Sequence, residues 1–175
     1  MLKKLLGGFI VAMVLLMGVA GTTQATTVER LTLEDLAARS QTIIQGTVRG
    51  TRSYWSSNGK LILTSTIIEV SESLKGQASG TVEVTTVGGR IGDTILHVGG
   101  MPAFAAGEST IVFAERANGF LTVLGMSQGK FTVSNGEVAN SPSELSFPDG
   151  RPARPTRMAV QTFKSRIRTM LERSR

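Results

Sequence analysis

The sequence predicts a mainly all-β fold, a sandwich or a barrel, with a short helix near its beginning and an amphipathic helix at its end. Runs of β-branched and aliphatic residues recur at an even spacing through the middle of the 175-residue chain. Three Asn-Gly pairs, which are strong signals for tight β-hairpins, lie among these runs. Apolar residues follow a helical spacing only in two end segments, which argues against an alternating α/β fold.

Residues 1–25 have the layout of a secretory signal peptide. Lys3 and Lys4 precede an uncharged apolar run over residues 5–20, and small and polar residues follow it. We expect cleavage after Ala25, with a cut after Ala20 as the alternative. A membrane-spanning anchor is the other interpretation, but it requires about 20 apolar residues and this run is shorter. The mature chain is expected to be exported to the periplasm or beyond, with no transmembrane segment.

The domain predicted over residues 26–140 begins with a helix. Thr32, followed three residues later by Asp35, forms a capping-box pattern at the start of a short apolar stripe. This pattern predicts a helix from Leu33 to about Arg39.

The remainder of the domain is predicted to be strands and hairpins. The β-branched run over residues 42–48 predicts the first strand. Residues 60–73 predict a long second strand, and because its apolar residues occupy both faces we expect it to bend or to contain a bulge. Further strands are predicted around residues 82–85, 91–98, 111–114, 120–124, 131–133 and 138.

The last 35 residues divide into two segments. Residues 141–155 hold four of the five prolines and are interpreted as a linker or a surface loop. Residues 156–175 predict an amphipathic helix. Its apolar face carries Ala159, Phe163, Ile167, Met170 and Leu171, and its basic face carries Arg157, Lys164, Arg168 and Arg175.

The formal net charge of +6 is unevenly distributed. Residues 26–150 hold nine Lys and Arg against twelve Asp and Glu, a net charge of −3. Residues 151–175 hold eight against Glu172 alone, a net charge of +7, and Lys3 and Lys4 supply the rest. Because the domain itself is mildly acidic, nucleic acid is not an expected partner. The basic helix could instead bind an anionic envelope surface or an exported protein, or it could dock on the domain, which we favour.

Composition excludes several chemistries. The chain has no cysteine and a single histidine. A disulfide framework, a thiolate zinc site, an iron–sulfur cluster, a catalytic thiol and a multi-histidine metal centre are therefore excluded. We expect no metal and no cofactor, and we assign no catalytic residue.

Several segments resemble a group of exported bacterial proteins of unassigned function. They are Ile44-x-Gly46-Thr47-Val48, Glu72-Ser73-Leu74-Lys75-Gly76, Val82-x-Val84, Gly88-Gly89, Pro102-x-Phe104-x-x-Gly107-Glu108 and Gly129-Lys130-Phe131. More distantly, their order is similar to that in netrin-like and tissue-inhibitor-of-metalloproteinase domains, which are Greek-key barrels of the oligonucleotide/oligosaccharide-binding (OB) type. The resemblance covers about residues 43–133 and implies a small OB-like barrel of five to six strands. Those inhibitors chelate zinc through an N-terminal cysteine that this chain lacks, so that mechanism is not implied.

Tyr54 and Trp55 are the candidate ligand-binding residues. They are the only Tyr and Trp, and they lie beside the first predicted hairpin turn. In OB-type barrels the loop between the first two strands binds oligomers, and aromatic rings there can stack on sugars or bases. The alternative, which we favour, is that Trp55 covers one end of the barrel with its indole N–H bonded to a loop carbonyl.

Other candidates are weaker. His97 lacks a nucleophile-elbow pattern elsewhere in the chain and is interpreted as an ordinary strand residue. The glycines at 88–89, 92 and 99–100 precede no predicted helix, so they indicate turns rather than a phosphate loop. The carboxylates of Glu69, Glu72 and Glu83 could form a glycosidase pair only if two of them faced each other in a cleft.

These observations favour an exported, non-enzymatic binding module. One alternative is a protease-inhibitor-like protein that uses the barrel edge and the loops near Tyr54-Trp55 and Met101-Pro102. The other alternative is a hydrolase whose carboxylates are drawn from Glu69, Glu72 and Glu83.

Overall fold

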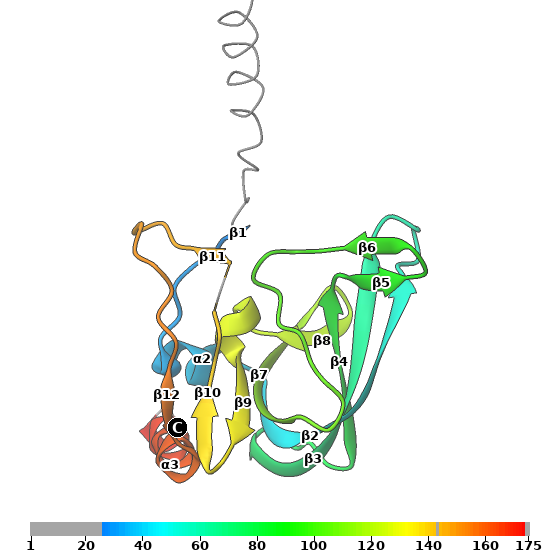
Figure 1. The fold of residues 1–175 in the computed structure, drawn as a ribbon. Helices are drawn as coiled ribbons and strands as arrows, with labels where there is room; N and C mark the ends of the chain where they lie inside the picture. The colour runs from blue at the N-terminus through cyan, green and yellow to red at the C-terminus, as the bar shows by residue number, and fades with distance from the viewer. Residues whose placement is uncertain (1–25, 143, 174–175) are drawn as a thin grey trace, which may run out of the picture.

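The computed structural model describes residues 26–142 and 144–173, and the fold of these residues is mainly β with two α-helices, as predicted (Figure 1). The expected leader, its cleavage site and Arg175 lie outside the described residues. The α-helices are α2 (Leu33–Arg39) and α3 (Val160–Arg173), and a 3-10 helix, η1, spans Met126–Gly129. The strands are β1 (Thr26–Thr27), β2 (Thr42–Trp55), β3 (Ile62–Lys75), β4 (Thr81–Val87), β5 (Gly89–Ile91), β6 (Thr94–Leu96), β7 (Ser109–Ala117), β8 (Phe120–Val123), β9 (Lys130–Ser134), β10 (Glu137–Ala139), β11 (Leu145–Ser146) and β12 (Arg157–Ala159).

One antiparallel sheet of eight strands organises the described residues. Its order is β12-β10-β9-β7-β2-β3-β4, and β8 pairs with the second half of β7. The sheet curls until β4 lies beside β8, but no hydrogen-bonded ladder joins these two strands. The sheet is therefore not closed into a barrel, and the small OB-like barrel is not confirmed.

The long strands β2 and β3 bend strongly, as the mixed apolar pattern of residues 60–73 predicts. Their pairing register shifts at three places, between Ile43 and Ile44, between Gln45 and Gly46, and between Val48 and Gly50. Each shift is a bulge that increases the local twist. At Gly46 a Cβ atom would lie 2.3 Å from the carbonyl oxygen of Glu69, so the close approach of the two backbones requires glycine.

The central strands β2 and β7 separate two hydrophobic cores. Because strand side chains alternate between faces, neighbouring residues of β2 enter different cores. Ile43 packs with Phe113, Phe131 and the two helices, whereas Ile44 packs inside the curl of the sheet with Val84. The first core holds three mutually packed aromatic rings, those of Phe113, Phe131 and Phe163.

The first helix confirms the capping prediction. The Thr32 hydroxyl accepts a hydrogen bond from the Asp35 N–H, and the Asp35 carboxylate accepts one from the Thr32 N–H. Both interactions satisfy backbone donors that a helix leaves free at its first turn. Leu36 and Ala37 bury the apolar stripe of α2 in the first core.

The segment expected to be a linker, residues 141–155, contacts the domain at several points. Its strand β11 pairs in parallel with β1, and its Leu145 and Phe147 side chains are buried. Arg30 holds the segment from outside, with both carboxylate oxygens of Asp149 at 3.1 Å and its guanidinium 3.9 Å from the Phe147 ring centroid.

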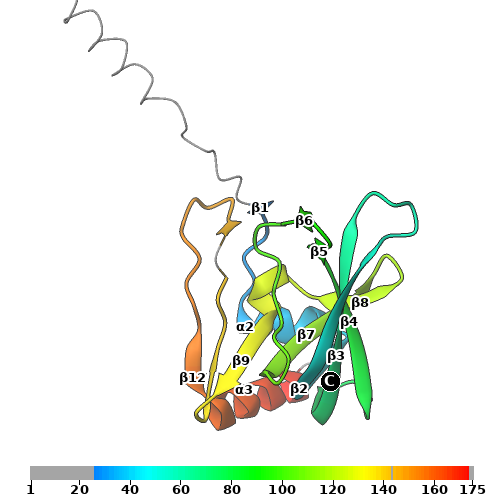
Figure 2. The same cartoon turned by 45° about the vertical axis from the view of Figure 1, so that its right-hand side comes forward.

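The C-terminal helix docks on the sheet. The predicted helix over 156–175 begins later than expected, because Arg157–Ala159 form β12 and α3 starts at Val160. Phe163 and Ile167 are fully buried in the first core, so the predicted apolar face is the docking face. Figure 2 shows α3 lying across the end of the sheet that is opposite β5 and β6. Within the described residues, no helix has the length and apolar character needed to cross a membrane.

Candidate functional site

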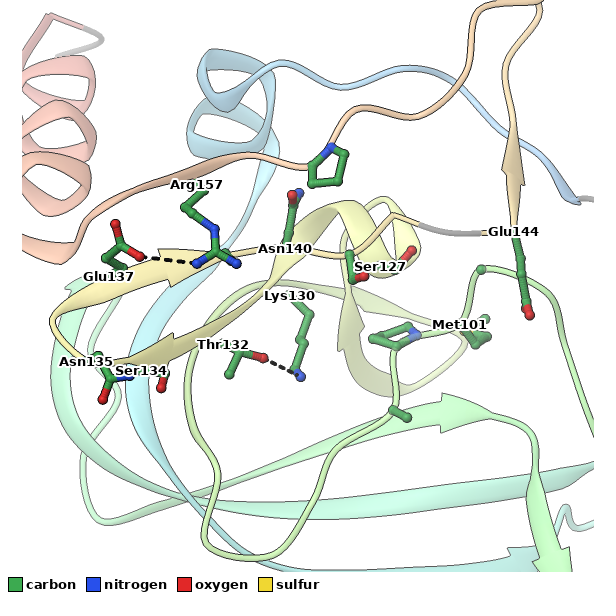
Figure 3. Close-up of a pocket in the computed structure, with 16 residues that line it drawn as sticks. Met101, Ser127, Lys130, Thr132, Ser134, Asn135, Glu137, Asn140, Glu144 and Arg157 are labelled. Atoms are coloured by element: carbon green, nitrogen blue, oxygen red, sulfur yellow. Dashed lines mark hydrogen bonds and ion pairs between the residues drawn. The ribbon is translucent and has the colours of Figure 1, made fainter.

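Two hollows flank the loop that joins β6 to β7, residues 97–108. The larger, which we call the Lys130 cleft, has a volume of about 730 Å³ and lies between this loop and strands β9, β10 and β12 (Figure 3). The smaller, which we call the hydroxyl pocket, has a volume of about 330 Å³ and lies between the loop and strands β2, β3 and β4. Met101, Pro102 and Ala103 line both hollows, so the loop forms their common wall.

A partly buried ion pair holds the wall of the cleft. The Lys130 ammonium on β9 donates hydrogen bonds to the Glu108 carboxylate, at the end of the loop, and to the Thr132 hydroxyl. Thr132 in turn donates to Glu108, and the Ala105 N–H donates to the same carboxylate at 3.1 Å. The ammonium also lies 5.4 Å from the ring centroid of Phe104. Side chains of Lys130 and Glu108 are only 15% and 12% exposed, so the pair is largely removed from water.

The environment of Glu108 keeps this residue ionised. Burial raises the cost of its negative charge, but the hydrogen bonds from Lys130, Thr132 and the Ala105 N–H outweigh that cost and lower the pKa of the carboxyl below its ordinary value. Lys130 therefore faces a permanent counter-ion near neutral pH, and the pair adds no net charge to the cleft.

The 3-10 helix η1 closes the cleft next to the loop. The Ser127 N–H donates to the Gly100 carbonyl at 2.9 Å, which ties the helix to the loop. The neighbouring Gln128 side chain bonds the backbone of the N-terminal segment, accepting from the Leu31 N–H at 2.9 Å and donating to the Glu29 carbonyl at 3.0 Å. Hydrogen bonds thus fix both the loop and η1 in the absence of a ligand.

The Ser127 side chain lines the cleft, and its hydroxyl oxygen is buried without a hydrogen-bond partner among the described residues. A serine nucleophile needs an adjacent base. Lys130, the nearest candidate in sequence, directs its ammonium to Glu108 and Thr132 instead. This arrangement does not activate Ser127.

The opposite wall comes from β10, β12 and the segment between them. Arg157 on β12 donates to Glu137 on β10 at 3.2 Å, and both side chains are substantially exposed at the rim. Asn140 binds the backbone of Thr156 through its side-chain oxygen at 2.7 Å. Figure 3 shows Lys130 and Thr132 in the gap between β9 and the loop that carries Met101, and the Arg157–Glu137 pair beside β10 at another edge of the same cleft.

Comparison of the chain with protein-family models, with curated proteins and with solved structures finds no match. Function is therefore argued from the chemistry of these hollows and of the surface. In the described part of the chain, no group of three or more His, Asp or Glu side chains could hold a metal ion.

Threonine and serine side chains line the hydroxyl pocket. They continue the inner face of the curled sheet, where the aliphatic residues Val48, Ile68 and Val84 give way to hydroxyls toward the end that carries β5 and β6. Thr66 is fully buried there, and its hydroxyl has no hydrogen-bond partner among the described residues. The lining hydroxyl residues are Thr51, Ser53, Thr64, Thr66 and Thr86.

Tyr54 and Trp55 lie at the end of β2, outside both hollows. Trp55 is 46% exposed, which is high for a tryptophan that would cover the end of a barrel. Tyr54 pairs with Leu63 across the β2–β3 ladder and is partly buried. The two residues therefore sit on a protruding hairpin rather than in a cleft.

The basic residues expected on the C-terminal helix contact the domain. Lys164 donates to Glu72 at 2.6 Å, and Arg168 donates to the other oxygen of the same carboxylate at 2.6 Å. Arg157 lies on β12 and pairs with Glu137. The Lys164 side chain is only 11% exposed, so it is a docking residue in this structure.

Each of the three candidate acids binds a different partner. Glu69 pairs with Arg49, Glu72 pairs with α3, and Glu83 accepts a hydrogen bond from Ser65. The structure does not bring two of them together in either hollow.

His97 lies in the loop after β6, with Nε2 3.0 Å from the carboxylate of Glu144. Its side chain is 73% exposed, and neither Ser127 nor Lys130 is bonded to it. It does not form a nucleophile–base pair.

Sequence reasoning missed Ser127, Thr132 and Lys130 as site residues. A signal was present, because Gly129-Lys130-Phe131 and Gly107-Glu108 both belong to the segments that carry the family resemblance. Nothing in the sequence, however, indicates that Lys130 on β9 meets Glu108, which directly precedes the neighbouring strand β7.

Proposed function

We propose that the protein is an exported, non-enzymatic binding module that holds a polar ligand of no net charge in the Lys130 cleft. Export rests on the signal-peptide layout of residues 1–25. The observation that carries the binding proposal is the preformed cleft of about 730 Å³, whose partly buried ion pair is internally neutral and whose buried Ser127 hydroxyl is unpartnered among the described residues.

The lining of the cleft favours binding over catalysis. A catalytic site needs a nucleophile or an acid held next to a group that activates it. The hydroxyls and amides of Ser127, Ser134, Asn135 and Ser141 instead offer neutral donors and acceptors on a rigid frame. Such groups suit the hydroxyls of a saccharide or the amides of a peptide.

The strand order supports a relation to OB-type barrels. Counting only β2, β3, β4, β7 and β8 as strands 1 to 5, the order across the curl is 3-2-1-4-5, with strands 3 and 5 side by side. This is the strand neighbourhood of the OB barrel, left open at one seam. We infer that the chain is a distant, unclosed member of that architecture.

Titration calorimetry against a panel of neutral oligosaccharides and uncharged peptides tests the binding proposal. We expect saturable binding by one ligand class, and Ser134→Trp, which fills the cleft from the end of β9, should weaken it at least about tenfold. Ala106→Trp places the same bulk on the loop surface outside the cleft and should bind as the wild type does.

Two outcomes would contradict the proposal. The first is an absence of binding across the whole panel, and the second is equal binding by the Ser134→Trp and Ala106→Trp variants. Melting curves of both variants show whether either substitution disturbs folding.

A further inference from the structure

Exposed apolar side chains gather at one end of the molecule, on two neighbouring hairpins. Trp55 and Leu61 flank the turn of the β2–β3 hairpin and are 46% and 42% exposed, and Ile95 on β6 is 57% exposed. Of the large apolar side chains exposed in the described part of the chain, only Phe120 lies elsewhere. We call the surface formed by Trp55, Leu61 and Ile95 the hairpin tip.

The two hairpins are fixed against each other, so their exposed apolar side chains lie at the same end of the molecule. The Gly88 N–H, at the start of the β5–β6 hairpin, donates to the Ile62 carbonyl at 2.8 Å. A Cβ atom at Gly89 would lie 2.4 Å from the hydroxyls of Ser53 and Thr64, which shows how closely β5 packs on β2 and β3. Figure 1 shows β5 and β6 crossing the end of the long β2–β3 ribbon.

Basic side chains surround this apolar tip. Arg52, Lys60 and Arg90 are exposed, and none of them forms an ion pair with another described residue. Asp93, in the turn between β5 and β6, is the acid nearest to Arg90 in sequence, and Glu69 is the acid nearest to Lys60. The tip therefore combines apolar groups with a positive charge, although residues 26–150 as a whole carry −3.

The described chain also begins at this end. Figures 1 and 2, which differ by a turn about the vertical axis, both place β1 at the same height as β5 and β6. The apolar run of residues 5–20 precedes β1 by only five residues. A leader held in a membrane through this run would keep the end of the domain that carries β1 near the lipid surface.

The geometry points to the hairpin tip as a surface that docks on an anionic lipid membrane. Trp55 inserts at the level of the headgroups, where its amphipathic ring is favoured, and Leu61 and Ile95 bury apolar area beside it. Arg52, Lys60 and Arg90 remain among the anionic headgroups, where their positive charge is attracted to such a surface. This docking is independent of the ligand in the Lys130 cleft.

The single tryptophan makes the test direct. The exported protein is added to vesicles of phosphatidylglycerol and phosphatidylcholine while the emission of Trp55 is recorded. We expect a shift to shorter wavelength, as the ring leaves water, and a much weaker response with pure phosphatidylcholine. Because an uncleaved leader would bind vesicles by itself, mass spectrometry first identifies the N-terminal residue, and all variants are compared with that same N-terminus.

Matched variants distinguish binding through the hairpin tip from non-specific binding to vesicles. The double variant Leu61→Ser with Ile95→Ser should lose at least about tenfold in its partition onto anionic vesicles, because two apolar contacts are removed. Phe120→Ser removes an equally exposed ring outside the tip and should stay within about twofold of the wild type. Arg90→Gln should weaken binding to anionic vesicles by about fivefold and leave binding to neutral vesicles unchanged.

Three results would overturn the proposal. They are an unchanged Trp55 emission with anionic vesicles, a double variant that binds as Phe120→Ser does, and a soluble polyanion such as heparin that shifts the emission when the vesicles do not. The last result would assign the tip to an anionic polymer. Circular dichroism melts confirm that the variants are folded.

Discussion

The ammonium nitrogen of Lys164 lies 2.6 Å from a carboxylate oxygen of Glu72, and this contact joins the C-terminal helix α3 to the long strand β3. Arg168 reaches the second oxygen of the same carboxylate from one turn further along the helix. Much of the positive charge that makes the helix basic in sequence is thus directed at the domain itself. An anionic surface that recruited this helix would have to compete with Glu72.

Removing the Glu72 charge should loosen the helix. Glu72→Gln leaves the largely buried Lys164 ammonium without its counter-ion, and we expect a loss of about 1–3 kcal/mol in the free energy of unfolding. Glu69→Gln is the matched control, because Glu69 lies on the same strand but pairs with the exposed Arg49, and it should cost less than about 1 kcal/mol. Urea denaturation of both variants measures the difference, and equal midpoints would contradict it.

Acid should weaken the Lys130–Glu108 pair. The folded state lowers the pKa of Glu108 below its ordinary value of 4.5, so the unfolded chain binds this proton at a higher pH than the folded chain does. The resulting stability is fully present above pH 4.5 and is lost as pH falls through the lowered folded pKa.

Glu108→Gln should therefore flatten the dependence of the unfolding free energy on pH below 4.5. Denaturation series at several acidic pH values measure the slopes, and an unaltered slope in Glu108→Gln would count against the pair.

Truncation of two neighbouring residues of η1 should affect the stability of the fold differently. Gln128→Ala leaves the Leu31 N–H and the Glu29 carbonyl without their partner, and we expect a loss of about 2–3 kcal/mol. Ser127→Ala removes a buried hydroxyl that has no partner among the described residues, so stability should stay within about 0.5 kcal/mol or rise. Thermal melts measure both, and a costly Ser127→Ala would show that the hydroxyl is already satisfied.

Gly100 should tolerate no side chain. Its φ is +79°, and a Cβ atom there would lie 2.0 Å from a methyl carbon of Leu145, which packs beneath the loop. We expect Gly100→Ala to cost about 2–4 kcal/mol, the sum of backbone strain and displaced packing. Gly59→Ala has a similar φ of +67° but open space around it, so it should cost only about 1 kcal/mol. Equal losses in the two variants would exclude the packing contribution.

Local patterns predicted the elements well. The Thr32–Asp35 capping box, the Asn58-Gly59 turn and the bent strand after it all depend on residues close in sequence, and each is present in the structure. The apolar spacing of the last helix also identified its buried face, including Phe163 and Ile167, although its start was placed four residues too early.

Long-range relationships were not predictable in the same way. Whether β4 pairs with β8 depends on how far β2 and β3 bend. The residues of β4 and β8 themselves do not predict the extent of that bend. The Lys130 cleft depends on a loop meeting a distant strand, and the partners Glu108 and Lys130 are ordinary charged residues in the sequence. The sequence shows which residues are charged, but the fold determines which positive side chain pairs with which negative one.

The division of the interior by β2 and β7 has a consequence for amide hydrogen exchange. Ile43 and Ile44 are consecutive, yet they belong to different cores, so breaking the β2–β7 ladder would disturb both cores at once. The amides of this ladder should exchange most slowly and at one common free energy, that of global unfolding. The two cores then behave as a single cooperative unit, despite having no side chain in common.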